Sequence, residues 1–428
     1  MSSIGNQGVG LRFYNNNIYI PLFLMERKMT NGGLKGFFED FLKRDSLFKQ
    51  KAILQASYMP EEILHREIEI KQLANILAPC LRLEKPSNLF VYGKTGTGKT
   101  LTLKYVCNHL LEISKNQGLP LKVIYVNCKL SKVADTEYRL IAQLARELGK
   151  EIPPTGLPTE EVYKIFHHAI TEKKVELLVV LDEIDQLIKK AGDEIIYNLT
   201  RINIELKGSQ ITLVGISNDL LFTDNMDPRV KSSLSEEEVV FAPYNALQLQ
   251  DILKKRATPA FKEGVLKEGV IEKCAAYAAR EHGDARRALE LLRVAGELAE
   301  RNEQQHVVIE HIDGAEEKIE KDRVLDIIKT QPKQQQATLF AILSLKKNNA
   351  IFTGEIYDLY KQICAKVGLR PLTQRRTSDI IAEMDMLGII NAKVISKGRF
   401  GRTREISLSI PASLITKITS VLEQSLGI

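Results

Sequence analysis

The segment Gly93–Thr100, with the sequence GKTGTGKT, fits the pattern G-x4-G-K-[ST]. It follows a short apolar run, Leu89–Tyr92, and leads into a segment with helical periodicity. Glycines let the backbone turn tightly so that its N–H groups face a phosphate, and the positive end of the following helix attracts the same anion. Lys99 can then reach the β- and γ-phosphates, and the Thr100 hydroxyl can bind Mg²⁺. The alternative is a glycine-rich turn that fits the pattern by chance, which the strand–loop–helix context disfavours. The residues of this loop that we predict to bind a nucleotide are Gly93, Lys94, Thr95, Gly96, Thr97, Gly98, Lys99, Thr100 and Leu101.

An acidic pair, Asp182-Glu183, stands at the carboxyl end of the apolar run Val175–Leu181. Asp182 there would hold Mg²⁺, mainly through water, opposite Thr100, and Glu183 would polarise the attacking water. The alternative is an acidic cap of the next helix. The phosphate loop upstream favours the catalytic interpretation.

These residues need elements that place them together. Apolar strand patterns alternate with helical patterns from residue 89 to residue 217, which predicts a doubly wound α/β domain with its ligands at the carboxyl ends of parallel strands. A further short strand, Val239–Phe241, precedes a wholly helical region that starts at Pro243. The predicted strands are Leu89–Tyr92, Leu121–Cys128, Val175–Leu181, Gln210–Ser217 and Val239–Phe241, and the helices after them are Leu247–Ala257, Val270–Arg280, Asp284–Arg301 and Glu310–Thr330.

Before the first strand the patterns are weaker. Residues 1–34 have no clear periodicity, which predicts a disordered or loosely held tail, and Met29 is an alternative start site by hypothesis. Pro60, followed by two acidic residues, fits the start of an amphipathic helix that continues to Pro79.

Composition limits the class of protein. The five cysteines are scattered without a C-x-x-C pair, which argues for a reducing cytosol and against a zinc ribbon or a disulfide framework. No apolar run approaches the roughly 20 residues of a membrane span, so we expect no membrane partner. From Gln331 onward the chain carries 14 Lys and Arg but only 7 Asp and Glu, whereas the first 330 residues carry 46 basic and 47 acidic residues. A basic terminal domain on a neutral body indicates a polyanion partner, most often nucleic acid, although a basic surface without a partner is the alternative.

The basic domain, residues 331–428, shows three helical patterns followed by a β-hairpin, which predicts a winged helix. On its third helix, Thr373–Leu387, we expect Ile380, Ile381, Met384 and Leu387 to form the buried stripe. The opposite face would enter the major groove of DNA, and the basic tip of the hairpin would enter a minor groove or follow phosphates. A winged helix used for protein contacts is the alternative. The residues predicted to contact DNA are Gln374, Arg375, Arg376, Ser378, Lys397, Arg399, Arg402 and Arg404, with a phosphate or structural role expected for Arg376.

Taken together, these motifs resemble the AAA+ ATPase superfamily and, more narrowly, the archaeal origin recognition complex/cell-division-cycle initiator family, over roughly residues 57 to 428. The fold class is therefore expected to be α/β, an AAA+ P-loop parallel sheet with a helical lid and a C-terminal winged helix. The domains would be a tail at 1–34, an ATPase base at 35–242, a lid at 243–330 and a winged helix at 331–428. The matching motifs are HRE at His65–Glu67, YVNC at Tyr125–Cys128, LDEID at Leu181–Asp185, TRIN at Thr200–Asn203, GISND at Gly215–Asp219, DPRVKSS at Asp227–Ser233, PYNALQL at Pro243–Leu249 and GDARRAL at Gly283–Leu289.

The resemblance implies roles at matching positions. Asn218 would orient the attacking water, and Arg286 would reach the phosphates from the lid, in preference to its neighbour Arg287. Arg229 would complete a neighbouring subunit's site, or only form a local salt bridge. The resemblance also implies a DNA-contacting helical insertion between Cys128 and Lys174. Further residues that it implies at the nucleotide are His65 and Arg66 in the adenine pocket, and Tyr244 and Arg256 at the start of the lid, for which hinge packing and a solvated face are the respective alternatives.

The function that the resemblance implies is an initiator that uses ATP, ADP and Mg²⁺ as a slow switch. It would bind double-stranded origin DNA, help recruit the replicative helicase, and assemble with itself or with paralogous initiators, in the cytoplasm at the nucleoid. The alternatives are an ATPase-coupled transcription regulator, a transposition helper with the same winged helix, and an ATPase of the clamp-loader type.

Overall fold

A computed structural model describes residues 35, 38, 39, 42, 43, 45–129, 135–153, 155–206, 208–221, 226–234, 236–345, 351–396, 402–410 and 412–428. The chain divides into two compact units, Met1–Ser46 and Leu47–Ile428. All the elements discussed below belong to the second unit. The predicted tail, residues 1–34, lies outside the described residues.

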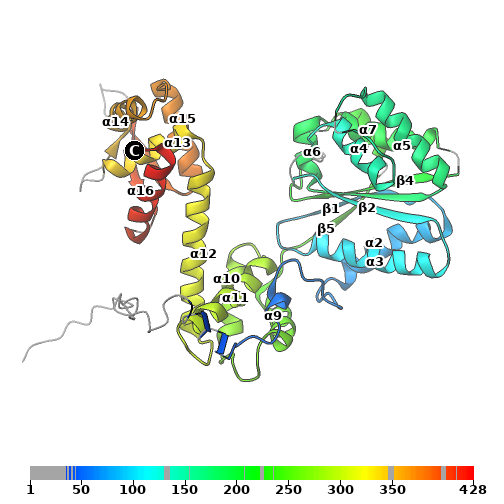
Figure 1. Cartoon of the computed structure of the whole chain (residues 1–428), viewed down its shortest axis with the longest axis horizontal. Helices are drawn as coiled ribbons and strands as arrows, with labels where there is room; N and C mark the ends of the chain where they lie inside the picture. The colour runs from blue at the N-terminus through cyan, green and yellow to red at the C-terminus, as the bar shows by residue number, and fades with distance from the viewer. Residues whose placement is uncertain are drawn as a thin grey trace, which may run out of the picture. The chain divides into compact units, whose positions relative to one another are not determined.

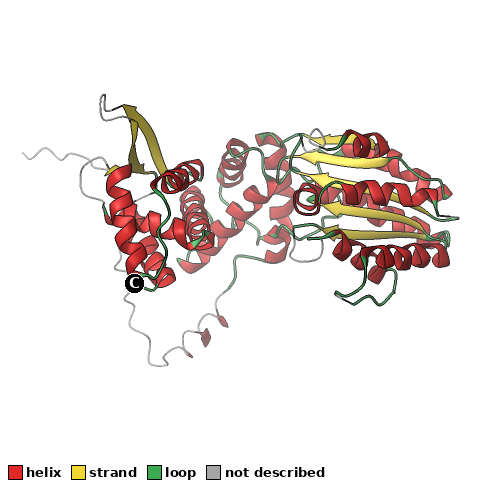
Figure 2. Cartoon of the chain, turned by 90° about the horizontal axis from the view of Figure 1, so that it is seen from above, coloured by secondary structure: helices red, strands yellow, loops and turns green. Residues whose placement is uncertain are grey.

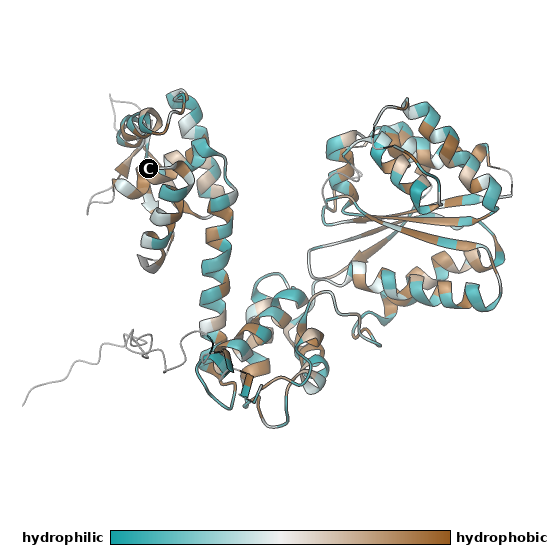
Figure 3. Ribbon diagram, in the orientation of Figure 1, coloured by the Kyte–Doolittle hydropathy of each residue, from teal (hydrophilic) through white to brown (hydrophobic). Residues whose placement is uncertain are grey.

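The central element is a parallel sheet with helices on both faces (Figures 1 and 2), as the alternation of strand and helix patterns predicted. In the described part of the chain it has five strands in the order β2-β3-β4-β1-β5. Side chains of β1 and β3 are buried along their whole length, and apart from polar residues at their ends these strands are apolar and appear mostly brown in Figure 3. The strands are β1 (Asn88–Gly93), β2 (Leu121–Asn127), β3 (Glu176–Asp182), β4 (Gln210–Ser217) and β5 (Glu236–Phe241).

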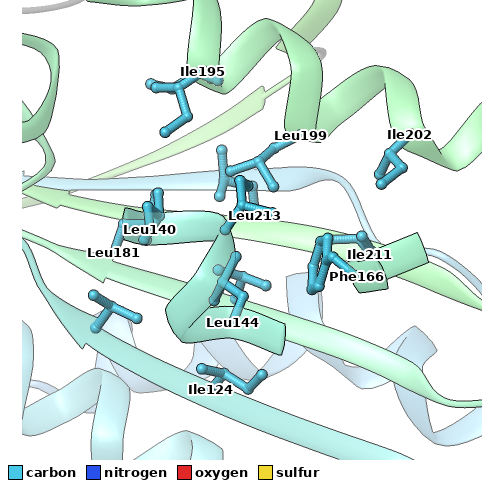
Figure 4. Close-up of a cluster of buried hydrophobic side chains, with 14 of the residues drawn as sticks. Ile124, Leu140, Leu144, Phe166, Leu181, Ile195, Leu199, Ile202, Ile211 and Leu213 are labelled. Carbon is cyan, nitrogen blue, oxygen red and sulfur yellow. The ribbon is translucent and has the colours of Figure 1, made fainter. Parts of the chain in front are cut away.

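Each face of the sheet has its own core. Helices α2 (Glu67–Leu77) and α3 (Lys99–Asn116) cover one face, where Leu73 and Leu103 pack on β1 and its neighbours. The other face is covered by α4 and α5, whose Leu140, Leu144 and Phe166 are fully buried (Figure 4), and by α6 and α7. The bounds of these four helices are α4 Glu137–Glu147, α5 Thr159–Lys173, α6 Ile184–Ala191 and α7 Glu194–Arg201.

The helix predicted from Pro60 begins later than expected. Helix α2 starts at Glu67, because His65 has a left-handed backbone (φ 59°) and Arg66 occupies the N-cap. An α-helix cannot continue through a residue in that conformation. The prediction of a helix start at Pro60 was therefore wrong, and residues 56–64 form a loop that matters for the site.

The helical region after β5 forms a separate core. It contains α9 (Ala246–Ala260), α10 (Val270–Arg280) and α11 (Ala285–Arg301), in close agreement with the predicted helices. The short 3-10 helix η2 (Lys51–Leu54) and the residues before it also join this core, and the rings of Phe48 and Phe261 are 4.6 Å apart. Sequence analysis had assigned residues 47–54 to the ATPase base, whereas their side chains pack in the lid.

Helix α12 (Ile309–Thr330) belongs to two cores at once. Ile312 and Ala315 pack in the lid, while Leu325 and Ile328 pack in the C-terminal domain. A continuous helix of 22 residues therefore connects the two domains.

The C-terminal domain is a winged helix, as predicted, with additional elements. The three predicted helices and the hairpin are present, and a short strand β6 and a final helix α16 complete the domain. On α15, Thr377, Ile380, Ile381 and Met384 are buried. Leu387 is 42% exposed, so its predicted place in the buried stripe was wrong; the helix ends at Met386 and its last turn leaves the core. The elements are α13 (Lys333–Ser344), β6 (Ile351–Phe352), α14 (Thr353–Lys366), α15 (Gln374–Met386), β7 (Ile390–Ser396), β8 (Arg402–Leu408) and α16 (Ala412–Leu426).

Candidate functional site

The glycine-rich loop connects the carboxyl end of β1 to the N-terminus of α3. Gly98 is the N-cap of α3 and has a left-handed backbone (φ 93°), a conformation that glycine adopts without strain. At Gly96, which has a φ of 75°, a Cβ atom would lie 1.7 Å from Oδ1 of Asp284, so both the backbone conformation and the contact favour glycine. The loop thus presents the N-terminus of α3 as an anion site, and it lies in direct contact with the lid.

Lys99 is held at the centre of the loop. Its Nζ donates hydrogen bonds to the carbonyls of Gly93 (2.6 Å) and Lys94 (2.7 Å) and to Oδ1 of Asn218 (2.9 Å). Burial lowers the pKa of Lys99 to about 8, against the opposing charge of Asp182. The amine therefore stays mostly cationic at neutral pH. The structure thus brings together Lys99 and Asn218, which are 119 residues apart in the sequence.

Asp182 and Thr100 lie together, as the sequence analysis expected. Thr100 Oγ1 donates a hydrogen bond to Asp182 Oδ2 (3.1 Å). A hydroxyl beside a carboxylate at the edge of the phosphate loop is an all-oxygen donor set that fits Mg²⁺. When bound, Mg²⁺ would neutralise charge on the phosphates.

Tyr125 on β2 also contacts Asp182; sequence analysis named it as part of the YVNC motif but gave it no role at the site. Its hydroxyl donates a hydrogen bond of 2.5 Å to Asp182 Oδ2. Burial and the neighbouring charge of Asp182 raise the pKa of Tyr125, so the hydroxyl remains a donor. The Lys104 amine lies 4.4 Å from the centroid of the Tyr125 ring. Only the pairing of β2 with β3 brings Tyr125 close to Asp182, so no local sequence signal could have indicated the contact.

Glu183 follows β3 in a left-handed conformation (φ 56°) and occupies the N-cap position of α6. Its side chain makes no capping hydrogen bond, which disfavours the alternative of a simple helix cap. One carboxylate oxygen instead lies 3.4 Å from the amine of Lys129. Its carboxylate is therefore held at the carboxyl edge of the sheet, next to Asp182.

A pocket of about 210 Å³ lies beside the loop, between residues 56–64 and the lid helices. Its lining includes both apolar side chains and glycines of the phosphate loop. Such a pocket suits a base joined to a polyphosphate. Seven of the predicted nucleotide-site residues line it, namely Gly96, Gly98, Thr100, Leu101, Tyr244, Arg256 and Arg286. Sequence analysis missed the contribution of the preceding loop, which supplies Ala56, Ser57, Tyr58, Met59, Pro60, Glu62, Ile63 and Leu64.

Arg256 lines this pocket. It is only 8% exposed, which contradicts the alternative of a solvated face. Its guanidinium carbon lies 4.5 Å from the centroid of the Tyr58 ring, and Nη2 donates a hydrogen bond to the Gln55 carbonyl (3.1 Å). Burial lowers the pKa of Arg256, whose Nε has no hydrogen-bond partner among the described residues. An unpaired buried donor beside the pocket is available to a polar ligand atom.

His65 and Arg66 do not line the pocket. His65 Nε2 pairs instead with Asp251 Oδ2 at 3.0 Å. Arg66 is buried and donates a hydrogen bond from Nε to the carbonyl of Thr97 in the phosphate loop (3.0 Å). Both residues are therefore close to the site, but the geometry does not place them against the space that a base would fill.

The two neighbouring arginines of the lid have different surroundings. Asp284 caps α11, accepting a hydrogen bond from the backbone N–H of Arg286, whose side chain is exposed at the pocket. Arg287 is held by three carboxylates. This agrees with the choice of Arg286 as the phosphate-facing arginine, because Arg287 is already neutralised. The distances from Arg287 are 3.2 Å to Glu281, 2.9 Å to Glu316 and 3.1 Å to Glu320.

Arg229 lies away from this pocket, near the start of α8 (Pro228–Leu234). Its guanidinium makes two hydrogen bonds to the carboxylate of Asp227, at 3.1 and 3.0 Å, and its side chain is 84% exposed. The side-chain hydrogen bond from Arg229 lowers the pKa of Asp227. The local salt bridge thus exists, and a role towards a second subunit stays a prediction.

The predicted DNA-contacting residues fall into three groups. Gln374 and Arg375 are exposed on the first turn of α15, and the structure shows no partner for Arg375 among the described residues. Arg376 pairs with Glu383 at 3.2 Å, consistent with a structural role. Arg404 donates a hydrogen bond to the carbonyl of Ser378 (2.7 Å), which ties the wing to α15. Lys397, Arg399 and the side chain of Arg402 lie outside the described residues.

Three family models match consecutive parts of the chain: an AAA domain at residues 82–221, a Cdc6 AAA+ ATPase-type lid domain at 250–317, and a CDC6 C-terminal winged helix domain at 326–418. An ORC1-type DNA replication protein of Thermococcus onnurineus is 54% identical over 388 residues, covering 89% of this chain and 93% of that protein. This chain belongs to the ORC1-type DNA replication protein family. Another member, from Pyrococcus abyssi, is 53% identical over 88% of this chain and 91% of its own length.

Solved structures agree with this family assignment. The structure of the Aeropyrum pernix ORC1 protein in complex with DNA superposes with a TM-score of 0.78 at 45% identity, covering 89% of this chain and 98% of that one. Cdc6p from Pyrobaculum aerophilum, at 22% identity and a TM-score of 0.56, shares the fold. The AAA+ ATPase fold and the winged helix predicted from sequence are thereby confirmed. None of the helices in the described residues is long and apolar enough to cross a membrane.

Proposed function

We propose that this chain is an ATP-controlled initiator that binds double-stranded DNA at replication origins and helps recruit the replicative helicase. Membership of the ORC1-type family supports a role in DNA replication, and the Aeropyrum pernix relative was solved on DNA. ATP, ADP and Mg²⁺ are the ligands of the site around Lys99, Thr100 and Asp182. The protein works in the cytoplasm at the nucleoid, alone or with copies of itself or paralogous initiators.

One observation supports control of DNA binding by ATP. The backbone N–H of Ala285 in the lid donates a hydrogen bond to the carbonyl of Gly96 in the phosphate loop (3.2 Å). From the lid, α12 continues without interruption into the core of the winged helix. A change at the phosphate loop therefore has a continuous packed route to the DNA-binding domain, as coupling between two sites requires.

The hydrolysis step follows from the side chains present. Asn218 and Glu183 hold and polarise the attacking water, Lys99 and Arg286 bind the phosphate oxygens, and the backbone of the loop fixes their positions. The amine of Lys129 competes for Glu183, which favours slow turnover. A slow ATPase suits a switch, because the bound nucleotide then persists long enough to define a state.

The proposed function is tested by genome-wide footprinting at a stated salt concentration, combined with depletion of the protein. We expect a few footprints at sites where replication starts and a loss of initiation on depletion. Footprints confined to promoters, with replication unaffected, would favour a transcription regulator with the same fold. Stable hetero-oligomers without sequence-specific DNA binding would favour a clamp-loader type of ATPase.

A further inference from the structure

Arg66 is buried between the phosphate loop and the start of the lid. It is 3% exposed, and its Nε donates a hydrogen bond to the carbonyl of Thr97, a fully buried residue of the loop. Glu69 lies 2.9 Å from Nη1 and balances the charge. A guanidinium in such a place is costly unless its N–H groups are used, so its remaining contacts define what it holds together.

Apart from a hydrogen bond to the carbonyl of His65 (3.4 Å) and the ring of Phe241 at 5.4 Å, the remaining contacts are to the segment that joins β5 to α9. Nη2 donates a hydrogen bond to the carbonyl of Ala242 (2.6 Å). The guanidinium carbon lies 3.9 Å from the centroid of the Tyr244 ring, within the range of a strong cation–π contact. Since the strand ends at Phe241 and the helix begins at Ala246, residues 242–245 connect the base to the lid, and we call this segment the hinge. The Arg66 side chain thus contacts both the phosphate loop and this hinge.

The hinge in turn touches the second lid segment at the site. A Cβ atom on Gly283 would lie 2.3 Å from the carbonyl oxygen of Tyr244, so these backbones are in direct contact. Two residues further on, Ala285 donates its backbone N–H to the carbonyl of Gly96. Arg66 therefore connects the phosphate loop to Tyr244, Tyr244 contacts the segment before α11, and the start of α11 is hydrogen-bonded back to the phosphate loop.

We propose that Arg66 is a positioning residue that couples the phosphate loop to the hinge of the lid, instead of a residue that contacts the nucleotide. This inference rests on the proposed function, in which ATP sets the state of the lid. The planar fork of arginine serves the two carbonyls and the ring at once, and lysine has neither its planarity nor its number of donors. Losing the contact would leave the pocket intact but would weaken the connection between the lid and the loop to the one made by Ala285 and its neighbours, which misplaces Arg286.

The test compares Arg66→Lys with Arg287→Lys, a matched control in which a partly buried lid arginine held by carboxylates is changed in the same way. ATP affinity, kcat and KM are measured together with amide hydrogen exchange of residues 242–248 and 283–289, with and without Mg-ATP. For Arg66→Lys we expect the Kd for ATP and KM to change less than threefold, and kcat to fall at least tenfold. ATP-induced protection of both segments should disappear in this variant and persist in the control.

Tyr244→Leu provides a second variant, because it removes the ring from the guanidinium while leaving Arg66 in place, and it should show the same loss of protection. A tenfold weaker Kd with unchanged kcat in Arg66→Lys would show instead that Arg66 binds nucleotide, and would overturn the inference. Persistent ATP-induced protection in both variants would overturn it as well. A wild-type protein that binds no ATP would refute the proposed function and this inference with it.

Discussion

Tyr125→Phe removes one hydroxyl from the candidate metal site and leaves the ring in place. That hydroxyl donates a 2.5 Å hydrogen bond to Asp182 Oδ2, which also accepts a hydrogen bond from Thr100. A hydrogen bond to a charged group contributes about 1.5–3 kcal/mol. Loss of a partner that orients a ligating carboxylate typically lowers metal affinity about 10- to 100-fold. Expressed as a free energy, that loss is similar to the contribution of the hydrogen bond. We therefore expect the Mg²⁺ concentration for half-maximal effect to rise about 10- to 100-fold.

The assay is an Mg²⁺ titration of ATP-bound protein, followed both by the shift in Tm and by the rate of ATP hydrolysis. Tyr105→Phe is the matched control, since Tyr105 lies on the neighbouring helix α3 and its hydroxyl has no partner among the described residues. Binding of ATP in the presence of EDTA should be unchanged in both variants. An unchanged Mg²⁺ midpoint in Tyr125→Phe would refute the idea that Tyr125 orients Asp182.

Four further predictions concern the loop, the base, a buried carboxyl and the DNA-binding helix. Lys99→Ala should abolish ATP binding in equilibrium dialysis, and wild-type affinity would contradict the role of Lys99 in the loop. Glu183→Gln should bind ATP normally but lose turnover, so a rate near wild type would exclude Glu183 as the residue that polarises water. Burial raises the pKa of Glu176 from 4.5 to about 7, so its contribution to stability is fully present below pH 4.5 and is lost as the pH rises through 7. At pH 9, Glu176→Gln should therefore raise the free energy of unfolding by up to about 3 kcal/mol and should raise the Tm in thermal unfolding. At pH 4 the variant and the wild type should be equally stable. Arg375→Ala should lose sequence preference in competition binding assays, whereas Arg376→Ala should keep it, because Arg376 is engaged by Glu383; a preference lost equally in both would argue against α15 as the recognition helix.

The phosphate loop, the acidic pair and the strand–helix alternation could be predicted from sequence because each is a local pattern. The loop is a run of eight residues, and the position of Asp182 at the end of a buried strand follows from the apolar run before it. The role of Asn218 came from the family resemblance, and its position directly after the predicted strand Gln210–Ser217 places it at the same edge of the sheet. Parallel strands place their carboxyl ends along one edge of the sheet, so these residues had to meet.

The features that sequence analysis missed depend on contacts between distant segments. Tyr125 and Asp182 are joined only through strand pairing, and the packing of residues 47–54 in the lid depends on partners more than 200 residues away, such as Phe261. Arg66 shows the same limit. The resemblance implied a place at the nucleotide for Arg66, which stays a prediction, and its contacts with Thr97 and Ala242 depend on segments that are distant in the sequence.

Control of DNA binding by ATP is the central claim, and the most direct measurement is the affinity of the protein for an origin fragment with ATP and with ADP at one fixed salt concentration. We expect site-specific affinity to differ between the two nucleotides and affinity for random DNA to be the same with both, and we expect Lys99→Ala to abolish the difference. Equal affinity for the origin fragment with ATP and ADP in the wild-type protein would contradict it.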